Sequence, residues 1–153
     1  MKEFDYYIFI DYSENLLGYI IVEFNKIKSL LPKISKIKHY KEVSKKSQYL
    51  KAIKSSFQKS DILNHLFSFK IKKVIQTLEI YTDIAEFIKS NRNRSIFVSI
   101  DDKQSSNFEK LVNIFNEEKV FIVKEGKLRK GSMEQRISLI IDNLLNLDRV
   151  KDG

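Results

Sequence analysis

The chain has 153 residues, of which 42% are hydrophobic, and it carries a formal net charge of +8 at pH 7. This length and apolar content predict a single domain over residues 1–153 with a proper core. The absence of cysteine excludes thiolate metal sites and cysteine nucleophiles, and two histidines are too few to favour a zinc site.

The amino-terminal segment does not resemble a signal peptide, because acidic residues interrupt its apolar run. Other apolar runs, such as Leu16–Val22, are far shorter than the roughly 20 residues that a membrane-spanning helix needs. We therefore expect a cytoplasmic protein that does not enter the membrane. The sequence does not determine the oligomeric state.

The first half of the chain predicts two strands followed by a helical segment. Apolar runs indicate strands at Asp5–Asp11 and Leu17–Phe24 that are close enough to pair as a hairpin. A short helix at Asn25–Leu31 is expected to stop at Pro32. Apolar residues at helical spacing then predict a helix over Ser44–Phe57.

The second half alternates between strands and helices. Period-two alternation predicts a strand at Phe67–Lys72, followed by a helix over Lys73–Ser90. A strand at Ser95–Asp101, a helix over Ser105–Glu117 and a short strand at Val120–Val123 follow.

A capping box at Ser132–Gln135 begins the last helix, which is expected to end near Leu147. The order β-β-β-α-β-α-β-α, with a basic helical insert after the second strand, predicts an α/β fold. Its mixed five-stranded sheet would have three antiparallel strands first, parallel strands afterwards, and helices on both faces.

The positive charge is concentrated in one segment. Between Lys26 and Lys59 there are eleven lysines and one acid, Glu42, which gives this basic segment a charge of +10 and leaves −2 for the remainder. Such a segment is either a solvated helix face or a phosphate-binding surface. We predict that it binds nucleic acid, DNA or RNA, through these lysines: Lys36, Lys38, Lys41, Lys45, Lys46, Lys51 and Lys54.

Three acids mark a candidate metal site. Asp11 and Asp101 end two apolar strands, and Asp142 is flanked by apolar residues in the last helix. Taken singly, the first two are equally typical of turns or caps, and Asp142 is equally compatible with an outward position. Together at one sheet edge they would bind Mg²⁺ or Mn²⁺, which prefer carboxylate oxygens.

The order of elements and the placement of these acids resemble the ribonuclease H-like fold. Within it, the chain is similar to an uncharacterised family that opens with a strand followed by Asp-Glu-Ser-Gly. The matching segments are Phe9–Asn15, the basic helical stretch Lys36–Lys54, the strand Ile96–Asp101 and the step Ile140–Asp142.

The chain departs from that family at Tyr12, where the family has an acid, and at Asn15, near its glycine. The resemblance also implies a fourth acid in the helix after the first three strands. Glu79 is the best candidate for this catalytic acid, and Glu42 is the other.

Two classes of function remain open at this point, with a weaker third. The first is a metal-dependent nuclease in which Asp11, Asp101 and Asp142 bind the ions. The second is a non-catalytic nucleic-acid-binding or assembly protein on the same fold. A small Rossmann-like enzyme or regulator would fit the parallel half of the sheet but not its antiparallel start. No Gly-rich phosphate loop, Gly-x-Ser-x-Gly elbow or His-Glu-x-x-His motif is present.

Overall fold

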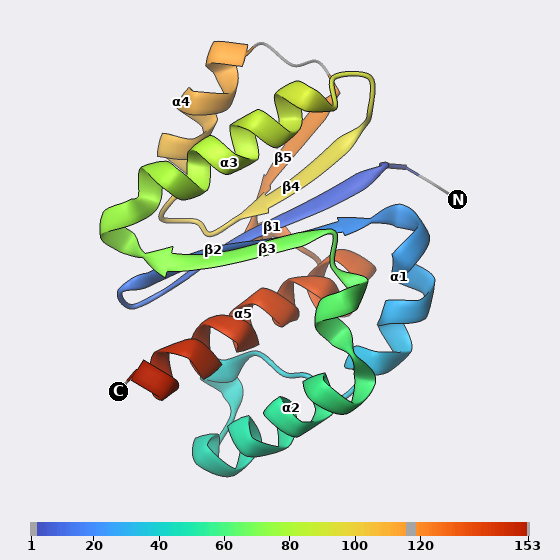
Figure 1. Ribbon diagram of the computed structural model, residues 1–153, viewed down its shortest axis with the longest axis vertical. Coiled ribbons are helices and arrows are strands. Elements are labelled where there is room, and N and C mark those ends of the chain that lie inside the picture. The colour runs from blue at the N-terminus through green and yellow to red at the C-terminus, as the bar shows by residue number, and fades with distance from the viewer. Residues whose placement is uncertain (1–2, 116–118, 153) are drawn as a thin grey trace.

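The computed structural model, which describes residues 3–115 and 119–152, contains one five-stranded sheet with helices on both faces (Figure 1). The order across the sheet is β3-β2-β1-β4-β5. The strands are β1 (Tyr6–Ser13), β2 (Leu16–Glu23), β3 (Ser68–Lys73), β4 (Ile96–Ile100) and β5 (Val120–Lys124).

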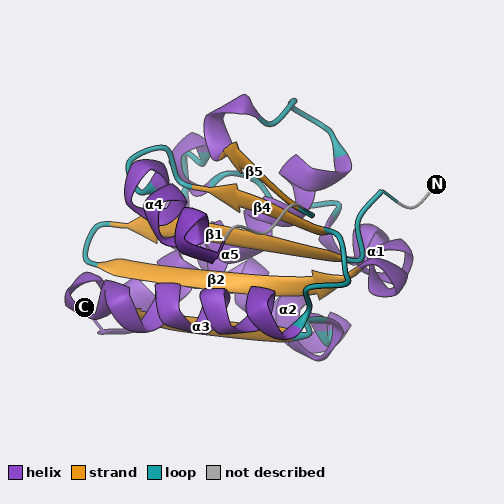
Figure 2. Cartoon of the chain, turned by 90° about the horizontal axis from the view of Figure 1, so that it is seen from above, coloured by secondary structure: helices purple, strands orange, loops and turns teal. Residues whose placement is uncertain are grey.

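The strand directions confirm the predicted mixed α/β sheet. β1 pairs antiparallel with β2, and β2 pairs antiparallel with β3, so the first three strands form a meander. β4 lies parallel to β1, and β5 lies parallel to β4. The central position of β1, between β2 and β4, is visible in Figure 2. The carboxyl ends of β1, β4 and β5 therefore meet at one edge of the sheet.

Within residues 3–115 and 119–152, five α-helices connect or follow these strands. Their bounds are α1 (Phe24–Leu30), α2 (Lys46–Ser60), α3 (Thr77–Ser90), α4 (Ser105–Phe115) and α5 (Met133–Asp152). The helix predicted over Ser105–Glu117 is present as α4, and residues 116 and 117 lie outside the described residues. The last helix extends beyond the predicted end at Leu147.

Burial on both faces explains why β1 is almost continuously apolar. Tyr7 and Phe9 of β1 pack in a core that α1, α2 and α5 cover, whereas Ile8 and Ile10 pack in a second core under α3 and α4. Figure 1 shows these two groups of helices on opposite sides of the sheet. Asp11 interrupts this pattern and is 5% exposed.

Gly18 allows α5 to approach the sheet closely. A Cβ at this position would lie 2.8 Å from the Lys70 carbonyl oxygen and 3.2 Å from Ile141 Cδ1 on α5. Gly18 is the cross-strand partner of Asp11. The missing side chain thus brings the middle of α5, where Asp142 lies, against the strand that carries Asp11.

The basic segment lies on the α5 side of the sheet. It forms α1, two short 3₁₀ helices over Leu31–Ile34 and Tyr40–Glu42, and α2. Apolar residues such as Ile34, Ile53 and Phe57 attach it to the core beneath α5, and its lysines point outward. Among the helices of the described residues, none has the length and apolar character needed to cross a membrane.

Candidate metal centre

Asp11 lies on β1 near the carboxyl end of this strand. Its Oδ1 accepts a hydrogen bond from the backbone N–H of Tyr12 at 2.8 Å. Burial raises the pKa of Asp11 well above its ordinary value, and the nearby carboxylates of Glu125, Asp142 and Asp101 raise it further. The central strand therefore presents a buried carboxyl group at the sheet edge.

Asp101 follows β4 directly and reaches the same edge, because β4 runs parallel to β1. The backbone N–H of Asp101 donates to the Ile10 carbonyl oxygen at 3.1 Å, which fixes the end of β4 beside Asp11. Its Oδ1 accepts from the backbone N–H of Lys103 at 2.9 Å. Asp11 and Asp101 therefore meet at one edge of the sheet, as the sequence predicts.

Glu125 follows β5 and is the third acid at this edge. Glu125 is not among the acids predicted from the sequence, although it also stands at the carboxyl end of a mostly apolar strand. Lys124 separates it from the apolar run and hides the pattern. Burial raises the pKa of Glu125, as do Asp101 and Asp142, and its carboxyl group is within hydrogen-bonding reach of Asp11.

These three residues, Asp11, Asp101 and Glu125, form what we call the acidic triad. Each contributes one carboxylate oxygen to a group whose members all lie within 4.8 Å of one another. In the part of the chain that the structure describes, no lysine or arginine forms an ion pair with any of them. Close carboxylates without a paired cation are costly unless they are protonated or bind a cation.

Asp142 lines the same pocket from α5 but is not one of the three grouped acids. It is 6% exposed. Its Oδ2 accepts from the backbone N–H of Tyr40 at 2.8 Å and lies 3.9 Å from His39 Nδ1. Burial raises its pKa, while the Tyr40 hydrogen bond, His39 and Lys41 oppose this rise. Asp142 therefore joins the basic segment to the pocket.

The structure places Glu79 away from the acidic triad. It lies in the first turn of α3, where its Oε2 is 3.3 Å from Lys70 Nζ and 3.6 Å from Lys72 Nζ. These lysines belong to the edge strand β3, two strands from β1. Glu42 lines the pocket adjoining the triad and is exposed.

The seven lysines predicted to bind nucleic acid are all exposed, but they fall into three groups. Lys38, Lys41 and Lys46 line pockets next to the acids. Lys45 lines a smaller pocket beside Tyr49. The remaining residues on the α5 side are Lys36, Lys51 and Lys54, and the last two lie on α2.

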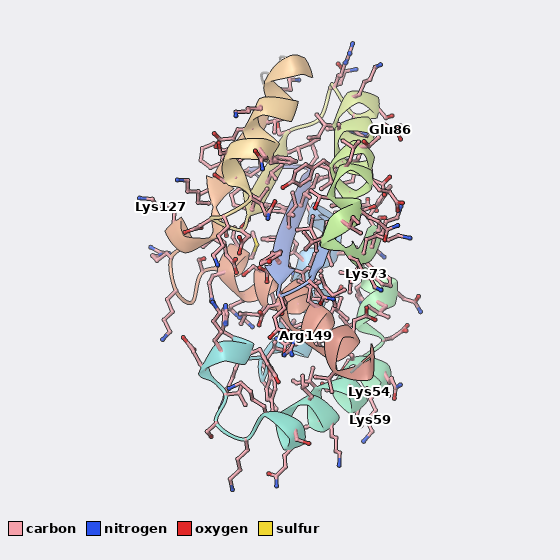
Figure 3. All side chains as sticks on the ribbon, turned by 90° about the vertical axis from the view of Figure 1, so that its left-hand side faces the viewer. Lys54, Lys59, Lys73, Glu86, Lys127 and Arg149 are labelled. Atoms are coloured by element: carbon pink, nitrogen blue, oxygen red, sulfur yellow. The ribbon has the colours of Figure 1, made fainter. Side chains whose placement is uncertain are left out.

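The pocket of about 700 Å³ that contains the acidic triad is also lined by an aromatic ring and by cations. Lys46 Nζ lies 5.4 Å and the Arg149 guanidinium carbon 5.7 Å from the centre of the Tyr40 ring. Arg149 also donates to Asn146 Oδ1 at 3.0 Å and lies 3.7 Å from Glu14 Oε1. Figure 3 shows Arg149 near the middle of this face. A pocket lined by both acids and cations suits a metal ion together with an anion.

No protein-family model, curated protein or solved structure matches the chain, so its function is inferred from the arrangement of this site.

Proposed function

We propose that the protein is a cytoplasmic, divalent-metal-dependent nuclease with a ribonuclease H-like fold that hydrolyses phosphodiester bonds of DNA or RNA. One observation carries the proposal: three carboxylates from the ends of β1, β4 and β5 converge within 4.8 Å. None of them has a lysine or arginine ion-pair partner among the described residues.

The donor set fits Mg²⁺ or Mn²⁺. Both ions prefer carboxylate oxygens, and the acidic triad contains no softer ligand. Such ions, when bound, activate water and stabilise the leaving oxygen of a phosphodiester. Asp11 is the central ligand of the proposed site, because it is the most buried of the three and lies on the middle strand.

The remaining residues of the pocket supply the means to hold a phosphate. Lys41, Lys46, Lys103 and Arg149 line it together with the acids. Cations at this position would offset the phosphate charge and orient the scissile bond toward the triad. The antiparallel meander followed by parallel strands is what the ribonuclease H-like resemblance implies, and it supports the same proposal.

Calorimetric titration of Mn²⁺ combined with a cleavage assay tests the proposal. Wild-type protein should bind Mn²⁺ and cut DNA or RNA only when the metal is present. Asp11→Asn should lose both properties and remain folded, because an asparagine Oδ1 can still accept the Tyr12 N–H. Glu86→Gln removes an exposed acid of α3 that does not line the pocket and lies far from Arg149 in Figure 3, so it is the matched control and should keep both. Absence of Mn²⁺ binding to the wild type would refute the metal site.

A second candidate, a nucleic-acid-binding or assembly protein without catalysis, is favoured by a different observation. Asp101 Oδ1 and Asp142 Oδ2 already accept backbone N–H groups, as structural carboxylates do, whereas the seven lysines are exposed. In that case, replacing Lys45, Lys46, Lys51 and Lys54 with Gln should weaken binding and flatten its salt dependence. Binding that survives these substitutions unchanged would show that α2 is a solvated face.

A further inference from the structure

The acidic triad lies where two pockets meet. The pocket lined by Asp11 and Asp142 has a volume of about 700 Å³, and the neighbouring one has about 690 Å³. They share the following lining residues: His39, Lys41, Asp101, Lys103 and Glu125. The two pockets are therefore halves of one groove, and two members of the triad stand at their junction.

Both arms of the groove contain cations beyond that junction, although acids line them as well: Glu42 and Asp102 in the first arm, and Asp11, Glu14 and Asp142 in the second. The first arm is lined by Lys38, Lys130 and Arg136, with apolar residues such as Leu128 between them. The second arm is lined by Lys46 and Arg149 beside Tyr40. A chain of phosphates that crosses the triad would thus meet cations on either side of it.

The lysines of the first arm are available to a ligand. Lys38 and Lys130 are exposed, and neither forms an ion pair with another residue of the described chain. Arg136 is less available, since it donates to the Leu31 carbonyl oxygen at 3.0 Å. The charge of Lys38 and Lys130 is therefore not neutralised by the fold, and a phosphate backbone can neutralise it.

We propose, building on the nuclease function above, that the groove holds an extended single strand of DNA or RNA that continues through both arms, so that the enzyme cuts within the strand and needs no free end. The position of the triad at the junction supports this. An enzyme that removes terminal nucleotides would have its acids at the closed end of one arm. Cations that follow a backbone, with an aromatic ring such as Tyr40 among them, are the usual features of a single-strand groove.

Covalently closed single-stranded circles, one of DNA and one of RNA, test the cutting mode. With Mn²⁺, at least one circle should be converted to linear product, and annealing a complementary strand should protect it. If the circles stay intact while linear strands lose their terminal nucleotides, the inference is overturned and the nuclease function still stands. Equal cleavage of the annealed circle would also overturn it, in favour of a duplex substrate.

Binding measurements in the Asp11→Asn background, where no cleavage is expected, test the path of the strand. Each phosphate contact contributes about 0.7 to the slope of log affinity against log salt for a single strand. The double variant Lys38→Gln/Lys130→Gln should therefore reduce the slope by about 1.4, and Lys46→Gln in the other arm by about 0.7. The matched control is Lys26→Gln/Lys28→Gln, which removes the same charge from α1, outside the groove.

The cleavage assay on circles and the binding measurements together distinguish failure of the proposed strand path from failure of the nuclease function. If no substrate is cut by the wild type but both arm variants lower the slope, the nuclease proposal fails and the strand path holds. If the α1 control lowers the slope as much as the arm variants do, the groove is not the path and the inference is overturned.

Discussion

The backbone N–H of Gly126 donates to Asp102 Oδ1 at 2.9 Å, and this hydrogen bond fastens the loop after β5 to the loop after β4. Each loop carries a member of the acidic triad next to the bonded residue, Asp101 in one and Glu125 in the other. A Cβ on residue 126 would lie 2.7 Å from Asp102 Oδ2, so glycine permits this approach. Asp102 thus sets the separation of two proposed ligands without belonging to the triad.

Asp102→Ala should accordingly weaken Mn²⁺ binding by about 10–100-fold, as is typical when a residue that orients metal ligands is lost. Asp102→Asn keeps an oxygen acceptor for the Gly126 N–H and should restore most of the affinity. Calorimetry on both variants checks this. Equal losses in Asn and Ala would show that the charge of Asp102, and not its hydrogen bond, is what the site needs.

Asp11→Asn should stabilise the metal-free protein at neutral pH. The folded-state pKa of Asp11 is raised, so this carboxyl group destabilises the fold as the pH rises above the ordinary aspartate pKa, and the full cost is reached above the raised folded-state pKa. Each unit of elevation corresponds to about 1.4 kcal/mol. The advantage of the variant should shrink as the pH falls and vanish below the ordinary aspartate pKa of about 4, where the carboxyl is protonated in both states.

Urea unfolding in the presence of a chelator, repeated at several pH values, measures this difference. Adding Mn²⁺ should reverse the order of stability, because only the wild type gains free energy from metal binding. If the variant is instead less stable than the wild type in chelator, the Asp11 carboxylate has a structural role.

Gly18→Ala should lower the free energy of unfolding by about 1–3 kcal/mol, the usual cost of overpacking a core. The new methyl group would meet the Lys70 carbonyl oxygen at 2.8 Å, and backbone cannot rotate out of the way as a side chain can. Thermal or urea unfolding measures the change. A variant as stable as the wild type would show that β3 and α5 shift readily, and the position of Asp142 would then be less constrained than we infer.

Alkaline pH should destabilise the protein through buried tyrosines. Burial is the largest cause that raises the pKa of Tyr7 to about 12, and nearby Glu134 and Glu3 also raise it. The unfolded chain ionises near pH 10, before the folded protein does, so stability should fall as the pH rises from about 10 to about 12. Tyr7→Phe, which keeps the ring, should show a smaller fall in urea unfolding over this range. Parallel curves for both proteins would contradict this assignment.

Much of the architecture follows from local sequence. Continuous apolar runs mark β1 and β4 because central strands are buried on both faces, whereas the edge strand β3 is only partly buried and its Phe69 is exposed. The capping box is also local, and Ser132 Oγ accepts from the Gln135 N–H at 3.2 Å. Gln135 Oε1, however, accepts from Gly131 N–H at 3.2 Å, one residue before the expected partner.

The meeting of Asp11 and Asp101 could also be predicted from sequence, because acids that end adjacent parallel strands reach the same edge of a sheet. The third member could not. Asp142 lies among apolar residues of the last helix, whereas Lys124 separates Glu125 from its apolar strand, and the sequence pattern alone does not say which of the two acids approaches Asp11 more closely. Similarly, helical spacing predicts α3 but not that Glu79 points to the lysines of β3.

Tertiary structure decided these positions through contacts between distant segments. The hydrogen bond between Asp102 and Gly126 brings Glu125 into the triad. The backbone N–H of Tyr40, from the basic segment, donates to one carboxylate oxygen of Asp142. Hydrophobic periodicity reports which face of an element is buried, so it predicts helices and strands. It carries no information on where a helix crosses the sheet or how two loops bond to each other, and those relations determine which carboxylates converge.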